Sequence, residues 1–308
     1  MKKILLSLSL CAAAAAPAVA GFSVGAGQTF GTNNYRGTKA NASLDLTDSF
    51  YVTPTFAVYR TDLSSGAHYQ GGLRLGYEIG PFSFGVTGAF APKTNGYKQN
   101  SVGADATFSL APGGTKHGRR MAGPSSQSNE TFGYGLAGVD VGVSGNHITH
   151  SDDNFAAGAA GAALRNAGAV RANRFTVGET DLTAFAGAKF LITEISAGVS
   201  KSFYDKTLEG NQLRESPLLA FGEFSAIQAG YPESGYNAKI KWKMLPFVRP
   251  YVAYTHTNFK LGSAPSNATE IGGNVGLDML NVKGAYGHYS QRGFASTDYF
   301  TLSAGFNF

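Results

Sequence analysis

Cysteine is almost absent from this chain of 308 residues, and its one cysteine, Cys11, lies in the N-terminal apolar segment. The rest of the chain therefore has no disulfide, no thiol nucleophile and no cysteine-based metal site. Charged residues are also scarce, at 15% of the chain. After residue 20 no apolar run approaches the roughly 20 residues that a membrane-spanning helix needs. These shortages exclude disulfide-stapled scaffolds and helical membrane proteins.

The N-terminus has the organisation of a cleavable export signal. Lys2 and Lys3 precede an apolar stretch, and residues 18–20 have the small-x-small pattern of a signal peptidase site. An uncleaved anchor is excluded because the apolar run is too short to span a bilayer. We expect residues 1–20 to be removed and residues 21–308 to form a single exported domain.

The net charge is too small to indicate a nucleic-acid partner. Loss of Lys2 and Lys3 with the signal lowers the basic residues from 25 to 23, against 20 acidic residues, which leaves +3. Glycine, with 41 residues, and aromatic residues, at 12%, are abundant instead. Export, aromatic content and alternation without long apolar runs favour an all-β fold, a transmembrane antiparallel up-and-down β-barrel, over a secreted soluble β-sandwich.

The closing residues show the alternation most clearly, because one face of the predicted strand is apolar and the other is polar or small. The apolar face consists of Phe300, Leu302, Ala304, Phe306 and Phe308. Residues 69–90 form an equally regular hairpin around a Gly-Pro turn. Similar segments recur along the chain and predict about 14 strands, within a range of about 12–16, which makes a barrel wide enough to enclose water.

Four segments do not fit the strand pattern. Residues 31–39 are expected to form a polar loop. Residues 111–130 are rich in Gly, Pro and Ser, and they are much longer than a periplasmic turn although strand parity places them on that side. Residues 155–174 follow an Asp-Asp-Asn cap and are rich in alanine, which predicts a short helix in an extracellular loop. Residues 205–234 are ambiguous, and their core, residues 218–228, fits a strand, a short helix or an inward-folded loop.

A ladder of lysines indicates a water-filled interior. Lys239, Lys241 and Lys243 alternate with apolar residues and so share one strand face. On a lipid-facing surface each would cost roughly 2–4 kcal/mol near the bilayer midplane. The ladder is therefore expected to face the lumen, either as part of an ordinary polar wall or as a positive field that attracts anions.

Other charged residues fall on the same polar faces. They complete the predicted pore lining: Arg74, Glu78, Asp105, Asp140, Lys189, Asp278 and Lys283. The alanine-rich segment adds Arg165, Arg171 and Arg174, which would line a constriction if it folds into the lumen and would otherwise decorate a surface loop. No Gly-rich phosphate loop and no His-Glu-x-x-His spacing occur, so neither a cofactor nor a metal site is predicted.

The export signal, the alternating strands and a last strand ending in aromatic-x-aromatic, Phe306 and Phe308, resemble the Gram-negative outer-membrane β-barrels. In size the chain is most similar to monomeric fourteen-stranded porins. The resemblance implies residence in the cell outer membrane, contact with lipid and lipopolysaccharide, and passive diffusion of small hydrophilic solutes. It also implies that Phe306 and Phe308 belong to the signal read by the outer-membrane barrel assembly machinery.

An enzymatic alternative rests on His288 and Ser290. His-x-Ser on one strand face is similar to the motif of the lipid A deacylases, which are barrel hydrolases. Asp298 lies on the outward face of the next predicted strand, so a serine nucleophile, a histidine base and an orienting acid could meet near the outer interface. Gln291 stands where that family has asparagine, and the barrel is larger. A non-conducting structural or adhesin barrel is the remaining alternative.

Overall fold

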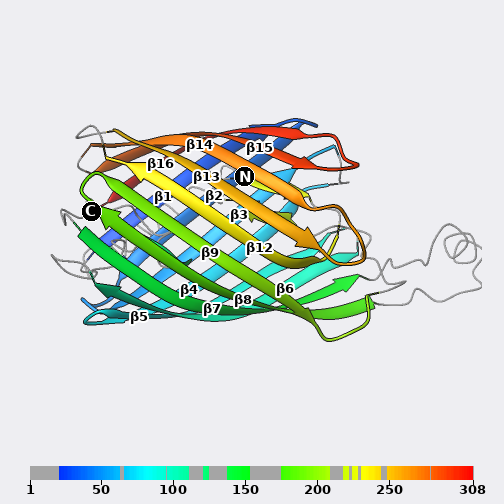
Figure 1. The fold of residues 1–308 in the computed structure, drawn as a ribbon, viewed down its shortest axis with the longest axis horizontal. Coiled ribbons are helices and arrows are strands. Elements are labelled where there is room, and N and C mark those ends of the chain that lie inside the picture. The colour runs from blue at the N-terminus through cyan, green and yellow to red at the C-terminus, as the bar shows by residue number, and fades with distance from the viewer. Residues whose placement is uncertain are drawn as a thin grey trace, which may run out of the picture.

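The computed structural model describes residues 21–62, 66–94, 96–110, 121–124, 137–152, 175–208, 218–221, 224–227, 230–243, 248–277 and 279–307. In this part of the chain 14 antiparallel strands close into a barrel, and two further strands form a small separate sheet (Figure 1). No helix of the described residues is long and apolar enough to cross a membrane.

The barrel strands are β1 (Gly21–Gly31), β2 (Tyr35–Asp45), β3 (Phe50–Arg60), β4 (His68–Ile79), β5 (Phe82–Thr94), β6 (Tyr97–Leu110), β7 (Ala137–Asp152), β8 (Phe175–Phe190), β9 (Thr193–Tyr204), β12 (Pro232–Trp242), β13 (Val248–Phe259), β14 (Ser266–Leu277), β15 (Leu280–Gln291) and β16 (Thr297–Asn307). Each pairs with the next, β9 pairs with β12, and β16 pairs with β1 to close the ring. The predicted all-β barrel and its strand number are confirmed, and the helix predicted within residues 155–174 lies outside the described residues.

The ambiguous part of the sequence between β9 and β12 contains two short strands. β10 (Leu218–Phe221) and β11 (Phe224–Ile227) pair with each other and not with the barrel. A strand was one of the three alternatives that the sequence allowed here. The strands belong to a side sheet and add nothing to the wall.

The prediction of a polar loop over residues 31–39 was wrong, because β2 begins at Tyr35. Only residues 32–34 turn, with Asn33 and Asn34 at φ of 56° and 51°, a left-handed conformation that asparagine tolerates. The first outward residues of β2, Arg36 and Thr38, are polar, so the apolar outer face that gives the period-two signal is missing there. Pairing with β1 holds them in the sheet.

The two ends of the barrel differ in their connections. The start of β1 and the end of β16 lie at one end, which we call the turn end, where the connections have two to five residues except for residues 111–136. We call the opposite end, at the right of Figure 1, the loop end. Strand parity correctly placed the long β6–β7 connection at the turn end.

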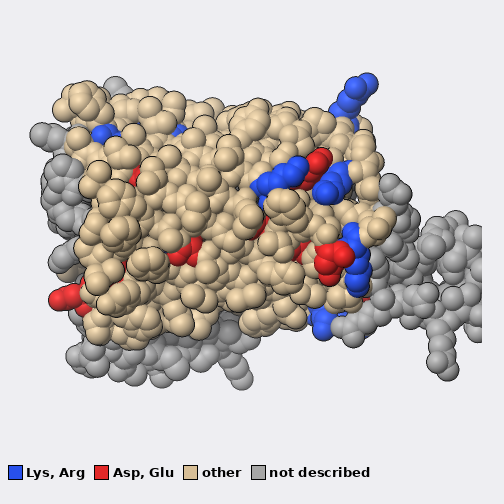
Figure 2. All heavy atoms as spheres, turned by 60° about the horizontal axis from the view of Figure 1, so that its bottom comes forward, with Lys and Arg blue, Asp and Glu red and all other residues tan. Residues whose placement is uncertain are grey.

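The outer face of the wall is apolar. Exposed side chains on it include Val24, Leu73, Val86, Val102, Val141, Val199, Ile271 and Leu302. In the view of Figure 2 this face is largely free of Lys, Arg, Asp and Glu, and most of the charged side chains seen there gather toward the loop end. Such a band is the surface that a closed barrel presents to hydrocarbon.

The inner face is polar, and glycines on it make room for tyrosine rings. The ring of Tyr51 on β3 leans over Gly76 on β4, where an added Cβ would lie 1.9 Å from the ring. Tyr251 on β13 leans over Gly272 on β14 in the same way, with a corresponding distance of 2.4 Å. These two glycines are therefore needed for the close approach of an aromatic ring.

The apolar core lies inside the barrel near the loop end. One cluster joins Tyr35, Ala268, Tyr289 and Tyr299 from four strands, with the rings of Tyr35 and Tyr299 packed edge to face at 5.1 Å. A second cluster joins Val177 on β8 to Leu208 and Tyr231, which lie in the β9–β12 connection. Apolar contacts thus join strands on the inner wall at the loop end.

Candidate functional site

The charged residues predicted to line a pore occupy inward strand positions, in alternation with the exposed apolar residues. Those that the structure describes within strands are Arg74, Glu78, Asp105, Asp140, Lys189, Lys239, Lys241 and Lys283. Lys243 directly follows β12. Asp278, Arg165, Arg171 and Arg174 lie outside the described residues. The inward placement agrees with the sequence, and a role in conduction stays a prediction.

Six of the cations gather on one part of the inner wall, toward the turn end. This basic wall, on strands β8 to β15 of the ring, consists of Lys189, Lys239, Lys241, Lys243, Arg249 and Lys283. Two inward carboxylates, Glu194 and Glu270, lie among them. The formal charge of the wall is therefore +4. The sequence reading missed Arg249, although its alternation with the inward Tyr251 could have revealed it.

The Glu194 carboxylate contacts two of the three lysines of the ladder. It stands directly opposite Lys241 in the β9–β12 register. Its carboxylate lies 2.6 Å from Nζ of Lys243 and 3.6 Å from Nζ of Lys241. The ladder is thus partly neutralised at its turn-end side.

The remaining lysine of the ladder meets a lysine from another strand at an aromatic ring. Nζ of Lys239 lies 4.3 Å from the centre of the Tyr251 ring, and Nζ of Lys283 lies 4.8 Å from it. Both distances fall within the range of cation–π attraction. The Tyr251 hydroxyl donates a hydrogen bond to Glu270. Residues of four different strands are thereby held together on the basic wall.

The wall across the lumen has a different charge pattern. β4 and β13 lie seven places apart in the ring of 14 strands, so they face each other. On the β4 side Arg74 forms a buried two-pronged ion pair with Asp105, with one of the two hydrogen bonds at 2.8 Å. Glu78 lies on the same inner face, 8% exposed. Of these three residues, two are acidic and one is basic, so a basic wall faces a weakly acidic one.

Asp140 differs from the solvent-facing acid that the sequence suggests. Its side chain has no exposed surface. One carboxylate oxygen accepts a hydrogen bond from the Ser109 hydroxyl, and the other accepts the backbone N–H of Met121. Asp140 is therefore engaged by the protein itself.

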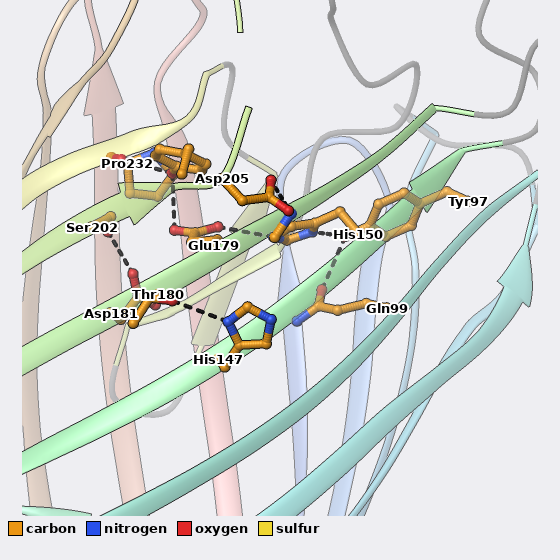
Figure 3. Close-up of polar contacts among 12 residues, drawn as sticks. Tyr97, Gln99, His147, His150, Glu179, Thr180, Asp181, Ser202, Asp205 and Pro232 are labelled. Atoms are coloured by element: carbon orange, nitrogen blue, oxygen red, sulfur yellow. Dashed lines mark hydrogen bonds and ion pairs between the residues drawn. The ribbon is translucent and has the colours of Figure 1, made fainter. Parts of the chain in front are cut away.

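A buried polar network at the loop end joins strands β6 to β9 (Figure 3). The Tyr97 hydroxyl lies 2.8 Å from Nδ1 of His150, and Nε2 of His150 lies 2.9 Å from Glu179. Tyr204 donates to the other oxygen of Glu179 at 2.9 Å and contacts the Pro232 carbonyl at 2.7 Å. The network bridges the wall where β8 and β9 lead into the longer connections.

Sequence reasoning missed this network. His147 and His150 are three residues apart, so in a strand they fall on opposite faces. His147 is exposed on the outer face beside Thr180, while His150 is buried inside. An inward His150 close to inward Glu179 was the available signal, but their pairing depends on the β7–β8 register.

Two members of the proposed hydrolytic triad meet on the outer face near the loop end. Nδ1 of His288 lies 2.7 Å from Asp298, which also accepts a hydrogen bond from the Tyr286 hydroxyl at 2.7 Å. Ser290 lies two residues further along the face of His288. Among the hydrogen bonds of the described residues, none joins Ser290 to His288. The structure thus brings Asp298 and His288 into contact. It does not bring Ser290 into hydrogen-bond contact with His288 within the described residues.

Comparison with known proteins supports the fold. No family model and no curated protein matches the sequence. Among solved structures, CdiB from Acinetobacter baumannii aligns with a TM-score of 0.50 and 8% identity over 94% of this chain and 60% of its own. This chain thus spans less than two thirds of that protein, and at this identity the similarity shows the barrel fold alone.

Other similar structures are barrels of comparable length. A loop L8 deletion mutant of OmpT, an outer membrane protein of Vibrio cholerae, has a TM-score of 0.44 and 12% identity over 94% of this chain and all of its own. The NanC porin has a TM-score of 0.43 and 7% identity over 92% of this chain and 98% of its own. The barrel expected from the sequence is confirmed by the closed ring of strands itself.

Proposed function

We propose that the protein is an outer-membrane channel for passive diffusion of small hydrophilic solutes, with a preference for anions. The observation that carries the proposal is the basic wall, where six cations and two carboxylates share neighbouring inner strands. A lumen lined by one sign of charge concentrates ions of the opposite sign. The weakly acidic wall across from it would orient a polar solute during passage.

Planar-bilayer recording tests the channel and its selectivity together. The purified wild-type protein is expected to form discrete conducting channels, and a salt gradient is expected to give a reversal potential of the sign for anion preference. Replacing Lys239 and Lys283 by glutamine should shift this potential toward cation preference. Lys201→Gln is the matched control, because Lys201 lies on the outer face beside Glu233. A wild type that carries no current, or that prefers cations, contradicts the proposal.

Outer-membrane residence is part of the same proposal. The apolar outer band supports contact with membrane lipid and lipopolysaccharide. Phe306 lies on this band, 46% exposed, opposite Val24 of β1; Phe308 lies outside the described residues. We expect Phe306→Ala, combined with deletion of Phe308, to lower the amount of folded barrel in the outer-membrane fraction if the assembly machinery reads these residues. Mass measurement of the mature protein tests removal of residues 1–20.

The hydrolase alternative keeps one specific observation in its favour, the contact between His288 and Asp298. If the barrel deacylates lipid A, both Ser290→Ala and His288→Ala should abolish the change in lipid A that expression of the wild type causes. We expect instead that lipid A extracted from cells with and without the protein has the same mass spectrum.

A further inference from the structure

The described part of the β6–β7 connection, residues 121–124, lies against the inner wall of the barrel. The backbone N–H of Met121 donates to Asp140, an inward residue of β7 with no exposed surface. The same carboxylate accepts the Ser109 hydroxyl of β6. Asp140 thus fixes the connection to two wall strands at once. The Ala122 side chain that follows is 4% exposed, so this segment is packed and not merely adjacent.

Two glycines of the inner wall, Gly187 and Gly142, leave room for the segment and for the Phe185 ring beside it. An added Cβ at Gly187, an inward position of β8, would lie 2.9 Å from Cβ of Met121 and 3.2 Å from Cβ of Ala122. Beside it, the Phe185 ring occupies space that is free only because residue 142 is glycine, since a Cβ there would lie 2.6 Å from the ring.

The segment is shaped to match. Gly123 has φ of 80°, and a Cβ there would lie 2.3 Å from the Phe185 ring. Glycine is the residue that takes this backbone conformation without strain and without a side chain in the way. Glycines on both the wall and the segment therefore permit one close contact.

We propose that residues 121–124 are a docked constriction of the pore, held in the lumen at the turn end, with Asp140 as its positioning residue. This explains why the β6–β7 connection is much longer than its neighbours at that end: it carries a segment into the lumen. The contact sits on β7 and β8 at Asp140 and Gly187, two positions along β8 from Lys189 of the basic wall, so solute moving along the basic wall would pass it. The effect on conductance rests on the proposed channel function, whereas the docking does not.

Crosslinking tests the docking. In a Cys11→Ser background, cysteines introduced as Ala122→Cys and Gly187→Cys should form a disulfide on mild oxidation, because their Cβ atoms lie close to the 3.5–4.5 Å separation of disulfides. The pair Ala122→Cys and Gly103→Cys is the matched control: Gly103 is an inward glycine of β6 opposite Asn146, which lies six positions along β7 from Asp140. No crosslink in the first pair, in protein that runs as a folded barrel on unheated gels, overturns the proposal.

Conductance tests the constriction. Asp140→Ala should raise single-channel conductance by roughly 1.5-fold or more, because pore diameter limits flow. Adding the Ala122→Cys and Gly187→Cys disulfide to this variant should return conductance to the wild-type value, and reduction should raise it again. If Asp140→Ala does not fold, Gly187→Leu, which displaces Ala122, should give the same increase. Unchanged conductance in both variants overturns the constriction. If the wild type carries no current, the proposed function fails, and the crosslink alone decides whether the segment docks.

Discussion

Arg74 on β4 reaches across the whole of β5 to form its ion pair with Asp105 on β6. The guanidinium passes over Gly85 of β5, where an added Cβ would lie 2.2 Å from it. The side chains are 8% and 2% exposed. One pair of residues and one glycine therefore tie three consecutive strands together on the lumen face.

Breaking this pair should destabilise the barrel strongly. Arg74→Leu or Asp105→Leu leaves a buried charge without its partner, and each should lower the free energy of unfolding by about 3–5 kcal/mol. The double variant should recover part of this loss. Unfolding by urea in lipid vesicles measures the change.

The control for this prediction is an exposed ion pair on the outer face. Lys201 and Glu233 lie 3.1 Å apart with side chains 48% and 42% exposed, so Lys201→Gln should cost less than about 1 kcal/mol. Equal losses for the two pairs would show that burial is not what matters.

Two neighbouring glycines of β14 should respond differently to alanine. Gly272→Ala places a methyl group against the Tyr251 ring and should cost roughly 1–3 kcal/mol through overpacking. Gly273 faces outward with nothing within 4 Å, and Gly273→Ala should be neutral or stabilising by up to about 1 kcal/mol. The thermal unfolding temperatures of both variants, measured in the same detergent, test this prediction. A stabilised Gly272→Ala variant would contradict the packing argument.

Removing the Glu194 carboxylate should strengthen anion preference. Glu194→Gln leaves Lys241 and Lys243 without the carboxylate that both contact, which raises the formal charge of the basic wall by one. The reversal potential in a salt gradient should move further in the anion direction. Glu233→Gln removes an outer-face carboxylate and should leave the potential unchanged. A shift toward cations in the first variant would count against the basic wall as the selectivity element.

The two histidines of β7 should differ in their importance for stability. His150→Ala removes the link between Tyr97 and Glu179 and leaves buried polar groups unsatisfied, at a cost of about 1–3 kcal/mol for each lost partner. His147→Ala removes an exposed side chain and should change stability by less than about 0.5 kcal/mol. Hydrogen exchange should increase in the first variant at the loop-end residues of β7 and β8.

The sequence predicts the barrel well wherever one strand face meets lipid and the other meets water, because the two surroundings impose a period of two. It fails where the outward face carries polar or small residues in place of apolar ones. The alternation predicts strands over residues 138–147 and 182–190, whereas β7 runs on to Asp152 and β8 begins at Phe175. The ladder hydrogen bonds therefore continue past the apolar band. The error at the start of β2 has the same cause.

The side chains that face the lumen could be predicted from strand parity. The contacts between those side chains could not. Glu194 contacts the lysine ladder because β9 pairs with β12. This pairing cannot be predicted from the sequence, because a long stretch with its own small sheet separates the two strands. Arg74 can reach Asp105 because the intervening strand β5 has a glycine, Gly85, where the guanidinium crosses it. Such contacts depend on register and on side-chain reach, and neither can be read from a pattern of apolar residues.

The seam between β1 and β16 bears on the order of events during folding. Thr29 and Thr301 share a hydrogen bond at 2.8 Å although 272 positions separate them. Hairpins between consecutive strands close short loops, whereas this contact brings together the two ends of the sheet. The entropy cost of closing so long a loop must be offset before the contact contributes any stabilisation. We therefore expect the seam to form last. Until it does, every partly built sheet exposes two unpaired strand edges, where a second chain can add.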